Sequence, residues 1–168
     1  ADIRLGPGKV GVRAEAAEPL EVPFAGGRLR ADREGEALVG RLDLDLRQEG
    51  RVSGDVRVAL SDAPWGARAV SGVVRARLAR LQLVEALVPQ LSGLQGSAEA
   101  TVELAGSVSQ PRLTPEAQVS VARAEVPRLG LLLQELELQV RQTTPGVLAV
   151  QGGVRSGEGR LDLTGNVR

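Results

Sequence analysis

The sequence predicts an all-β fold built around a long, mostly antiparallel sheet. Apolar and polar residues alternate along many short stretches, and this period of two places one face of a strand in an apolar environment and the other in water. The stretches are bounded by Gly, Pro or Ser, which favour tight turns. Only Trp65 and Phe24 are aromatic, so Leu, Val and Ala must fill the interior. The pattern amounts to roughly ten strands.

The alternating stretches identify the side chains that share the apolar face of each predicted strand. Asp, Glu, Arg, Thr and Gln occupy most of the positions between them, as expected for the opposite, solvated face. The residues predicted to line the apolar face are Leu42, Leu44, Leu46, Val56, Val58, Leu60, Val74, Leu78, Val102, Leu104, Val119, Val121, Leu136, Leu138, Val140, Leu161 and Leu163.

Turns between these stretches are short. Residues 48–50, 143–146 and 156–159 each contain a glycine, which reaches positive φ without steric cost and suits a hairpin. Consecutive strands joined by such turns form an antiparallel meander.

Three segments depart from the pattern. Residues 80–91 carry apolar side chains at helical spacing before and beyond Pro89, so we expect one short helix near 80–91. Residues 14–24 contain Pro19 and Pro23 and are expected to be an irregular connection. Trp65 follows Pro64 and is expected to pack over an edge of the sheet.

Composition argues against an enzyme and against binding to nucleic acid. Lys+Arg and Asp+Glu are both 21, and the arginines are spread singly, whereas a nucleic-acid footprint needs clustered basic charge. The chain has no His and no Cys, which removes the usual general base and nucleophile pairs. The acidic pairs Asp43/Asp45 and Glu135/Glu137 lie on the solvated face of their strands. We expect no catalytic residue, no cofactor and no metal site.

The apolar faces can be covered in three ways. Two sheets can pack as a sandwich, one sheet can close as a barrel, or an open sheet can curl into a trough. A sandwich usually fills its wide gap with aromatic residues, and this chain has almost none. Burial against itself is still the default for an apolar face, so the sandwich and the trough both stay open at this point.

Residues 70–168 contain a series of short motifs in a defined order. An alternating strand (72–78) is followed by an apolar segment with a proline (81–91), a Leu-x-Gly strand (92–106) and a Pro-x-Leu step (107–113). A Pro-x-x-Gly-Leu step (126–131) and a glycine-punctuated repeat (152–165) come next. In this order the motifs resemble the TamB/AsmA-like family of bacterial envelope proteins, and residues 1–69 match that family more loosely.

The resemblance implies that residues 1–168 form one β-groove segment of a larger protein, in which the sheet curls into a taco-like open groove with an aliphatic interior. The apolar residues named above would then line a groove for phospholipid acyl chains or unfolded outer-membrane protein strands. The implied location is the periplasm, with an inner-membrane anchor in a segment absent here and a TamA-like outer-membrane barrel-assembly partner. The implied role is phospholipid transport and outer-membrane protein assembly. The alternative is a structural β-sandwich spacer of a surface or adhesin protein with no ligand.

Overall fold

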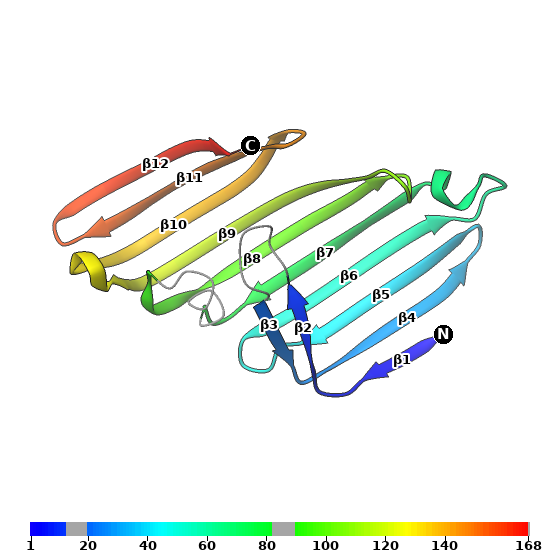
Figure 1. Cartoon of the computed structure of the whole chain (residues 1–168), viewed down its shortest axis with the longest axis horizontal. Coiled ribbons are helices and arrows are strands. Elements are labelled where there is room, and N and C mark those ends of the chain that lie inside the picture. The colour runs from blue at the N-terminus through cyan, green and yellow to red at the C-terminus, as the bar shows by residue number, and fades with distance from the viewer. Residues whose placement is uncertain (13–19, 82–89, 168) are drawn as a thin grey trace.

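The computed structural model describes residues 1–12, 20–81 and 90–167, and these residues form an open, single-layered antiparallel sheet (Figure 1). The main sheet has ten strands in the order β1-β4-β5-β6-β7-β8-β9-β10-β11-β12, and β2 and β3 form a separate two-stranded sheet. The sheet ends at β1 on one side and β12 on the other, so it is not closed. The predicted all-β, mostly antiparallel and open fold is therefore confirmed.

The strands lengthen toward the middle of the sheet. Its N-terminal half comprises β1 (Asp2–Leu5), β4 (Gly26–Glu34), β5 (Ala37–Asp45), β6 (Gly50–Ala59) and β7 (Val70–Leu78). Its C-terminal half comprises β8 (Ser92–Gly106), β9 (Pro111–Val126), β10 (Leu131–Thr144), β11 (Val147–Ser156) and β12 (Gly159–Val167). Short 3-10 turns, η1 (Trp65–Ala67) and η2 (Pro127–Leu129), join β6 to β7 and β9 to β10.

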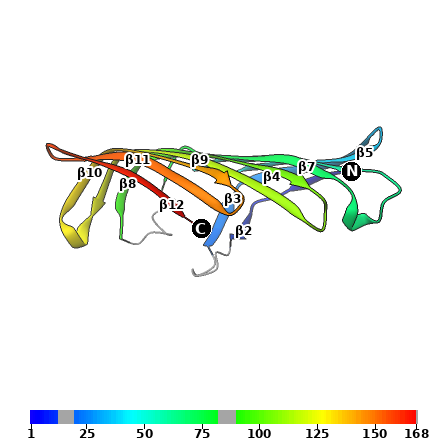
Figure 2. The same cartoon turned by 90° about the horizontal axis from the view of Figure 1, so that it is seen from above.

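The N-terminal third is more regular than the sequence suggested. β1 pairs directly with β4, and the hairpin of β2 (Gly8–Val12) and β3 (Leu20–Phe24) is inserted between them in the chain. The expectation of an irregular connection was therefore wrong for residues 20–24, while residues 14–19 lie outside the described part. Pro23 fits in β3 because this strand has only one neighbour, so no second ladder needs its missing N–H. Figure 2 shows the hairpin standing off the plane of the main sheet.

The predicted hairpin turns are present. β10 and β11 are joined at Pro145–Gly146, where Gly146 has φ +79°, and β11 and β12 at Gly157–Glu158, where Gly157 has φ +59°. The turn after β5 has Arg47 at φ +61°, and Gly50 then begins β6.

The predicted helix near 80–91 falls mainly on residues 82–89, which lie outside the described part. On either side of this gap, Leu81 is 1% exposed and belongs to a small core cluster with Leu94, Val121 and Ala124. Leu91 packs against the same cluster. The cluster closes over the sheet at the end of the strands where β8 begins and β9 ends.

The described residues form no second large sheet against the first, so the sandwich alternative is wrong for this part of the chain. Within the same residues only eight hydrophobic side chains are buried, and no polar or charged residue is. A single-layered sheet has no partner layer to cover its apolar face. Most of that face is consequently half-buried or exposed.

Candidate functional site: the apolar face of the sheet

One face of the main sheet is apolar from edge to edge. Residues that pair directly across an antiparallel ladder point to the same face. One such row crosses all ten strands and contains only apolar side chains and glycine: Leu5, Gly27, Leu44, Val52, Ala76, Ala100, Ala117, Val140, Val150 and Gly165. With about 4.8 Å between neighbouring strands, this row is about 43 Å long. We call this side of the sheet the apolar face.

The opposite side of the sheet is polar. The row that shows this takes, from each strand, a residue next in sequence to the one in the apolar row. It contains Arg4, Arg28, Asp43, Ser53, Arg75, Thr101, Glu116, Arg141, Ala149 and Asn166. We call this side of the sheet the charged face. A one-residue shift of register would exchange the two faces, so the alternation fixes the register of the sheet.

The structure places fifteen of the seventeen predicted lining residues within strands of the main sheet, on the apolar face. Leu46 and Leu60 are the exceptions, because each follows the last residue of its strand. Leu46 is 5% exposed, and its N–H donates to the Gly50 carbonyl in the turn. The Leu60 N–H donates to the Glu36 carbonyl.

Sequence reasoning missed lining residues on three strands. Ile3 and Leu29 pair with each other on β1 and β4, and Val150 and Val154 lie on β11. The signal on β11 was available, because Leu148, Val150 and Val154 keep the period of two through Gly152. On β4 only Leu29 is a large apolar residue, so the alternation was too weak to recognise.

Large side chains on the apolar face reach solvent in the described structure. Buried aliphatic residues are the rule in a closed core, and a contiguous exposed set marks an interaction surface. The exposed members are Ile3 (51%), Leu29 (38%), Leu38 (37%), Val74 (37%), Leu113 (57%), Leu161 (59%), Leu163 (46%) and Val167 (55%).

The apolar face is also the concave one. Figure 2 shows both 3-10 turns displaced to the same side of the sheet, as the strands bend into an open trough. Strand glycines show which face lies inside the bend. An added Cβ would lie 2.4 Å from the Asp55 carbonyl oxygen at Gly72, 2.1 Å from that of Ser120 at Gly96 and 2.3 Å from that of Glu137 at Gly152.

These three glycines pair with Val56, Val121 and Leu138, so they lie on the apolar face. Neighbouring backbones approach too closely there for any side chain, which is the role glycine plays at sharp bends of a sheet. The glycines therefore allow the sheet to bend toward its apolar side.

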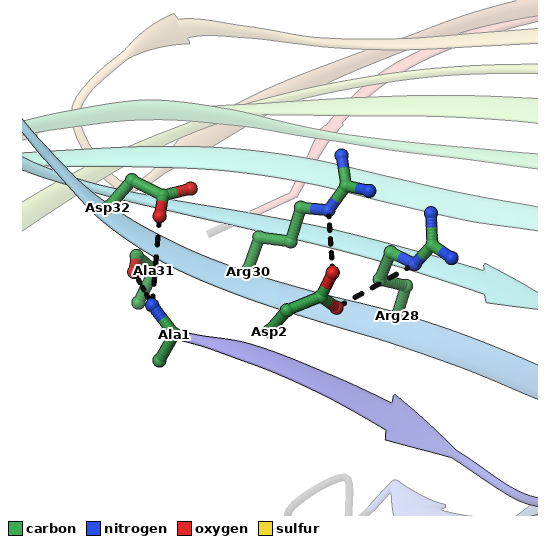
Figure 3. Close-up of polar contacts among 6 residues, drawn as sticks. All are labelled: Ala1, Asp2, Arg28, Arg30, Ala31 and Asp32. Atoms are coloured by element: carbon green, nitrogen blue, oxygen red, sulfur yellow. Dashed lines mark hydrogen bonds and ion pairs between the residues drawn. The ribbon is translucent and has the colours of Figure 1, made fainter.

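The charged face carries cross-strand ion pairs. Asp2 on β1 lies between two arginines of β4, with its carboxylate 3.7 Å from Arg28 Nε and 3.3 Å from Arg30 Nε (Figure 3). Further along, Glu34 bonds to Arg41 and Arg57, and the hydrogen bond from Arg41 is the main reason that the pKa of Glu34 lies below its ordinary value. Exposed pairs of this kind contribute little to stability, but their charged side chains make this face favourable to solvate.

Among the described residues, no group of three or more His, Cys, Asp or Glu could hold a metal ion. Likewise, no helix in the described ranges is long and apolar enough to cross a membrane. The chemistry available to the apolar face is the burial of apolar surface.

Comparison with known proteins identifies the family of this chain. A family model described as TamB, N-terminal domain, matches residues 1–119, which is well over half of the 168 residues. The chain belongs to the TamB family. No curated protein matches it, and no solved structure does either.

The family match includes residues 1–69, where the sequence motifs were weakest, and it ends within β9. The TamB family is associated with the bacterial envelope. Strands β10 to β12 lie beyond the match, yet they continue the same sheet and the same apolar face.

Proposed function

We propose that this TamB family chain holds the acyl chains of phospholipids on the concave apolar face of its sheet. The observation that carries the proposal is the unbroken apolar row across all ten strands, together with the exposure of large side chains on that face. The expected setting is the periplasm, where such a segment of a larger, inner-membrane-anchored protein supports phospholipid transport and outer-membrane protein assembly.

The energetics favour such a carrier. Exposing a 16-carbon acyl chain to water costs about 12 kcal/mol at ~0.8 kcal/mol per CH₂ group. A trough lined by Leu, Val and Ala removes most of this cost while the polar headgroup stays in water. One leaflet of a bilayer is about 15 Å of hydrocarbon, so the ~43 Å row is longer than one acyl chain and can guide it over several strands.

A second candidate client is an unfolded outer-membrane protein strand. β12 is an edge strand in which all nine residues are exposed. An unpaired edge offers backbone N–H and C=O groups to an added strand, and the adjoining apolar face would accept alternate apolar side chains. In the full-length protein, a TamA-like barrel-assembly protein is the expected partner for such delivery.

The proposal is tested by native mass spectrometry after the purified protein has been incubated with phospholipid vesicles. We expect the protein to retain bound phospholipid. Val102→Asp or Leu138→Asp should remove it, because each puts a carboxylate on the apolar face. The matched control is Gln139→Asp, which puts the same group on the charged face, next to Leu138 in β10.

A folded protein that never retains lipid would contradict the lipid proposal. It would leave either a trough reserved for protein strands, which an added outer-membrane protein peptide would then occupy, or a spacer without a ligand. Equal loss of lipid in Gln139→Asp and Leu138→Asp would also contradict it, because binding would then not depend on the apolar face.

A further inference from the structure

Two strand connections carry exposed apolar side chains at opposite ends of the strands. Trp65, in η1 after β6, is 54% exposed, and Leu129, in η2 after β9, is 70% exposed. Because successive strands from β6 to β9 reverse direction, β6 and β9 end at opposite ends of the strands. Figures 1 and 2 show η1 and η2 at these opposite ends.

The η1 tip, comprising Trp65 and Arg68, is held in place by hydrogen bonds. Ser109 donates to the Gly66 carbonyl oxygen from its backbone N–H at 2.9 Å and from its hydroxyl at 2.8 Å. Arg68 Nε donates to the Ala63 carbonyl at 3.1 Å, and its guanidinium lies 5.5 Å from the centre of the Trp65 ring. Trp65 was expected to pack over an edge of the sheet; it lies in the η1 turn with about half of its surface exposed and with Arg68 over its ring.

The η2 tip, comprising Arg128, Leu129 and Leu131, has the same chemistry. Leu131 is 43% exposed, Arg128 is exposed, and the turn is closed by a hydrogen bond from the Gly130 N–H to the Pro127 carbonyl. Neither Arg68 nor Arg128 forms an ion pair with any residue in the described ranges.

Both tips lie on the concave side of the sheet, so they flank the mouth of the trough (Figure 2). A single exposed apolar residue is ordinary on a protein surface, but here each rim places a large exposed apolar side chain beside an arginine that forms no ion pair within the described residues. Tryptophan favours the boundary between headgroups and hydrocarbon, and arginine binds phosphate. A phospholipid surface matches both properties at once.

We propose that the two tips dock the mouth of the trough on the surface of a phospholipid bilayer, with Trp65 and Leu129 entering the headgroup region. This inference rests on the proposed lipid-binding function and names the surface from which the lipid enters. The span between the tips favours a bilayer over a protein partner. β9 alone has 16 residues, about 50 Å at ~3.3 Å per residue, and a bilayer meets rims so far apart without needing a matching shape.

Trp65 is the only tryptophan, so its fluorescence reports on the η1 tip alone. We expect vesicles of phosphatidylethanolamine and phosphatidylglycerol to shift its emission to the blue, and lipids with brominated acyl chains to quench it. Leu129→Ser should weaken vesicle binding about tenfold, since burying such a side chain contributes roughly one factor of ten or more.

Trp65→Ser, followed by vesicle sedimentation, should weaken binding by a similar factor. The matched control is Gln118→Ser, which replaces an exposed side chain on the charged face in the middle of β9, away from both tips. This control should bind vesicles like the unaltered protein.

Emission that does not change with vesicles would overturn the inference, as would vesicle binding that Trp65→Ser and Leu129→Ser leave intact. A blue shift that depends on protein concentration alone would assign the tips to a protein interface and would also overturn it. Uptake of a short-chain phospholipid dispersed as monomers tests the trough separately. If this uptake fails while the vesicle-induced shift persists, the proposed function fails and docking stands.

Discussion

Glycine decides how closely neighbouring strands can approach on the apolar face. Gly40 and Gly72 both pair with Val56, one from each side. An added Cβ at Gly72 would lie 2.4 Å from the Asp55 carbonyl oxygen, whereas at Gly40 its nearest neighbour would be 3.9 Å away. The bend is therefore concentrated on the β7 side of β6, and the two glycines form a natural pair for comparison.

Gly72→Ala should destabilise the protein by about 1–3 kcal/mol, the usual cost of forcing extra volume into a packed site. Gly40→Ala should stay within about 1 kcal/mol of the unaltered protein, because it meets no clash and restricts the unfolded chain. Urea unfolding followed by circular dichroism measures both. Equal loss of stability in the two variants would show that the close approach at Gly72 does not constrain the sheet.

Glu34 is the acidic residue that responds most clearly to its neighbours. Its pKa lies below the ordinary value of 4.5, first because Arg41 donates a hydrogen bond to it and then because the Arg41 and Arg57 charges stabilise the carboxylate. Arg41→Gln should raise the pKa of Glu34 toward the ordinary value, as measured by NMR titration of the side-chain carboxyl carbon. Arg33→Gln, which removes a neighbouring arginine on β4, should leave it in place.

The sign of the effect on stability follows from linkage. A carboxyl whose pKa is lower in the folded state stabilises the fold above its unfolded-state pKa, and this contribution is lost as the pH falls through the folded-state value. The Arg41–Glu34 pair should therefore matter at neutral pH and disappear in acid. A stability difference between Arg41→Gln and the unaltered protein that persists at low pH would contradict this assignment.

At the scale of elements, the sheet is partly split between β9 and β10. The two strands pair from Leu131 with Val126 to Arg141 with Glu116, and the split begins at the next residue of β9, Pro115. Proline has no N–H to give to a ladder, so it belongs where pairing ends. From Pro115 back to the start of β9, the strand pairs only with β8. The last residues of β10, after Arg141, pair only with β11.

Amide exchange should reveal this split. Thr143 falls at the register irregularity of β10 and pairs with neither neighbouring strand, whereas Leu138 pairs with Val119 on one side and Gly152 on the other. We expect the Thr143 amide to exchange close to the unprotected rate and the Leu138 amide to exchange far more slowly. Comparable protection of the two amides in NMR hydrogen exchange would show that β9 and β10 pair along their full length.

The elements show what alternation can and cannot predict. β5, β8 and β10 carry several large aliphatic residues at a period of two, so their faces could be assigned without a structure. β4 carries Leu29 as its only large apolar residue, among arginines and glycines, so its apolar face could not be assigned from the sequence. The insertion of β2 and β3 could not be foreseen, because the pairing of β1 with β4 is a contact between distant residues that no local pattern encodes.

At the scale of the whole molecule, the alternation predicted one apolar face but not the side to which it bends. The direction of bending follows from Gly72, Gly96 and Gly152, whose role becomes visible only when their cross-strand neighbours are known. Sequence alone also left a sandwich and a trough as alternatives. The absence of a second large sheet in the described residues decides between them, because it leaves the aliphatic side chains facing an open concavity.

Acyl chains on the apolar face would be detected most directly by cross-linking the protein to a phospholipid with a photoactivatable group in its acyl chain and mapping the adducts by peptide mass spectrometry. We predict adducts at apolar-face residues such as Val74, Val102 and Leu138, and none at charged-face neighbours such as Arg75, Thr101 and Gln139. Adducts divided equally between the two faces, or confined to the edge strand β12, would contradict a lipid-holding trough.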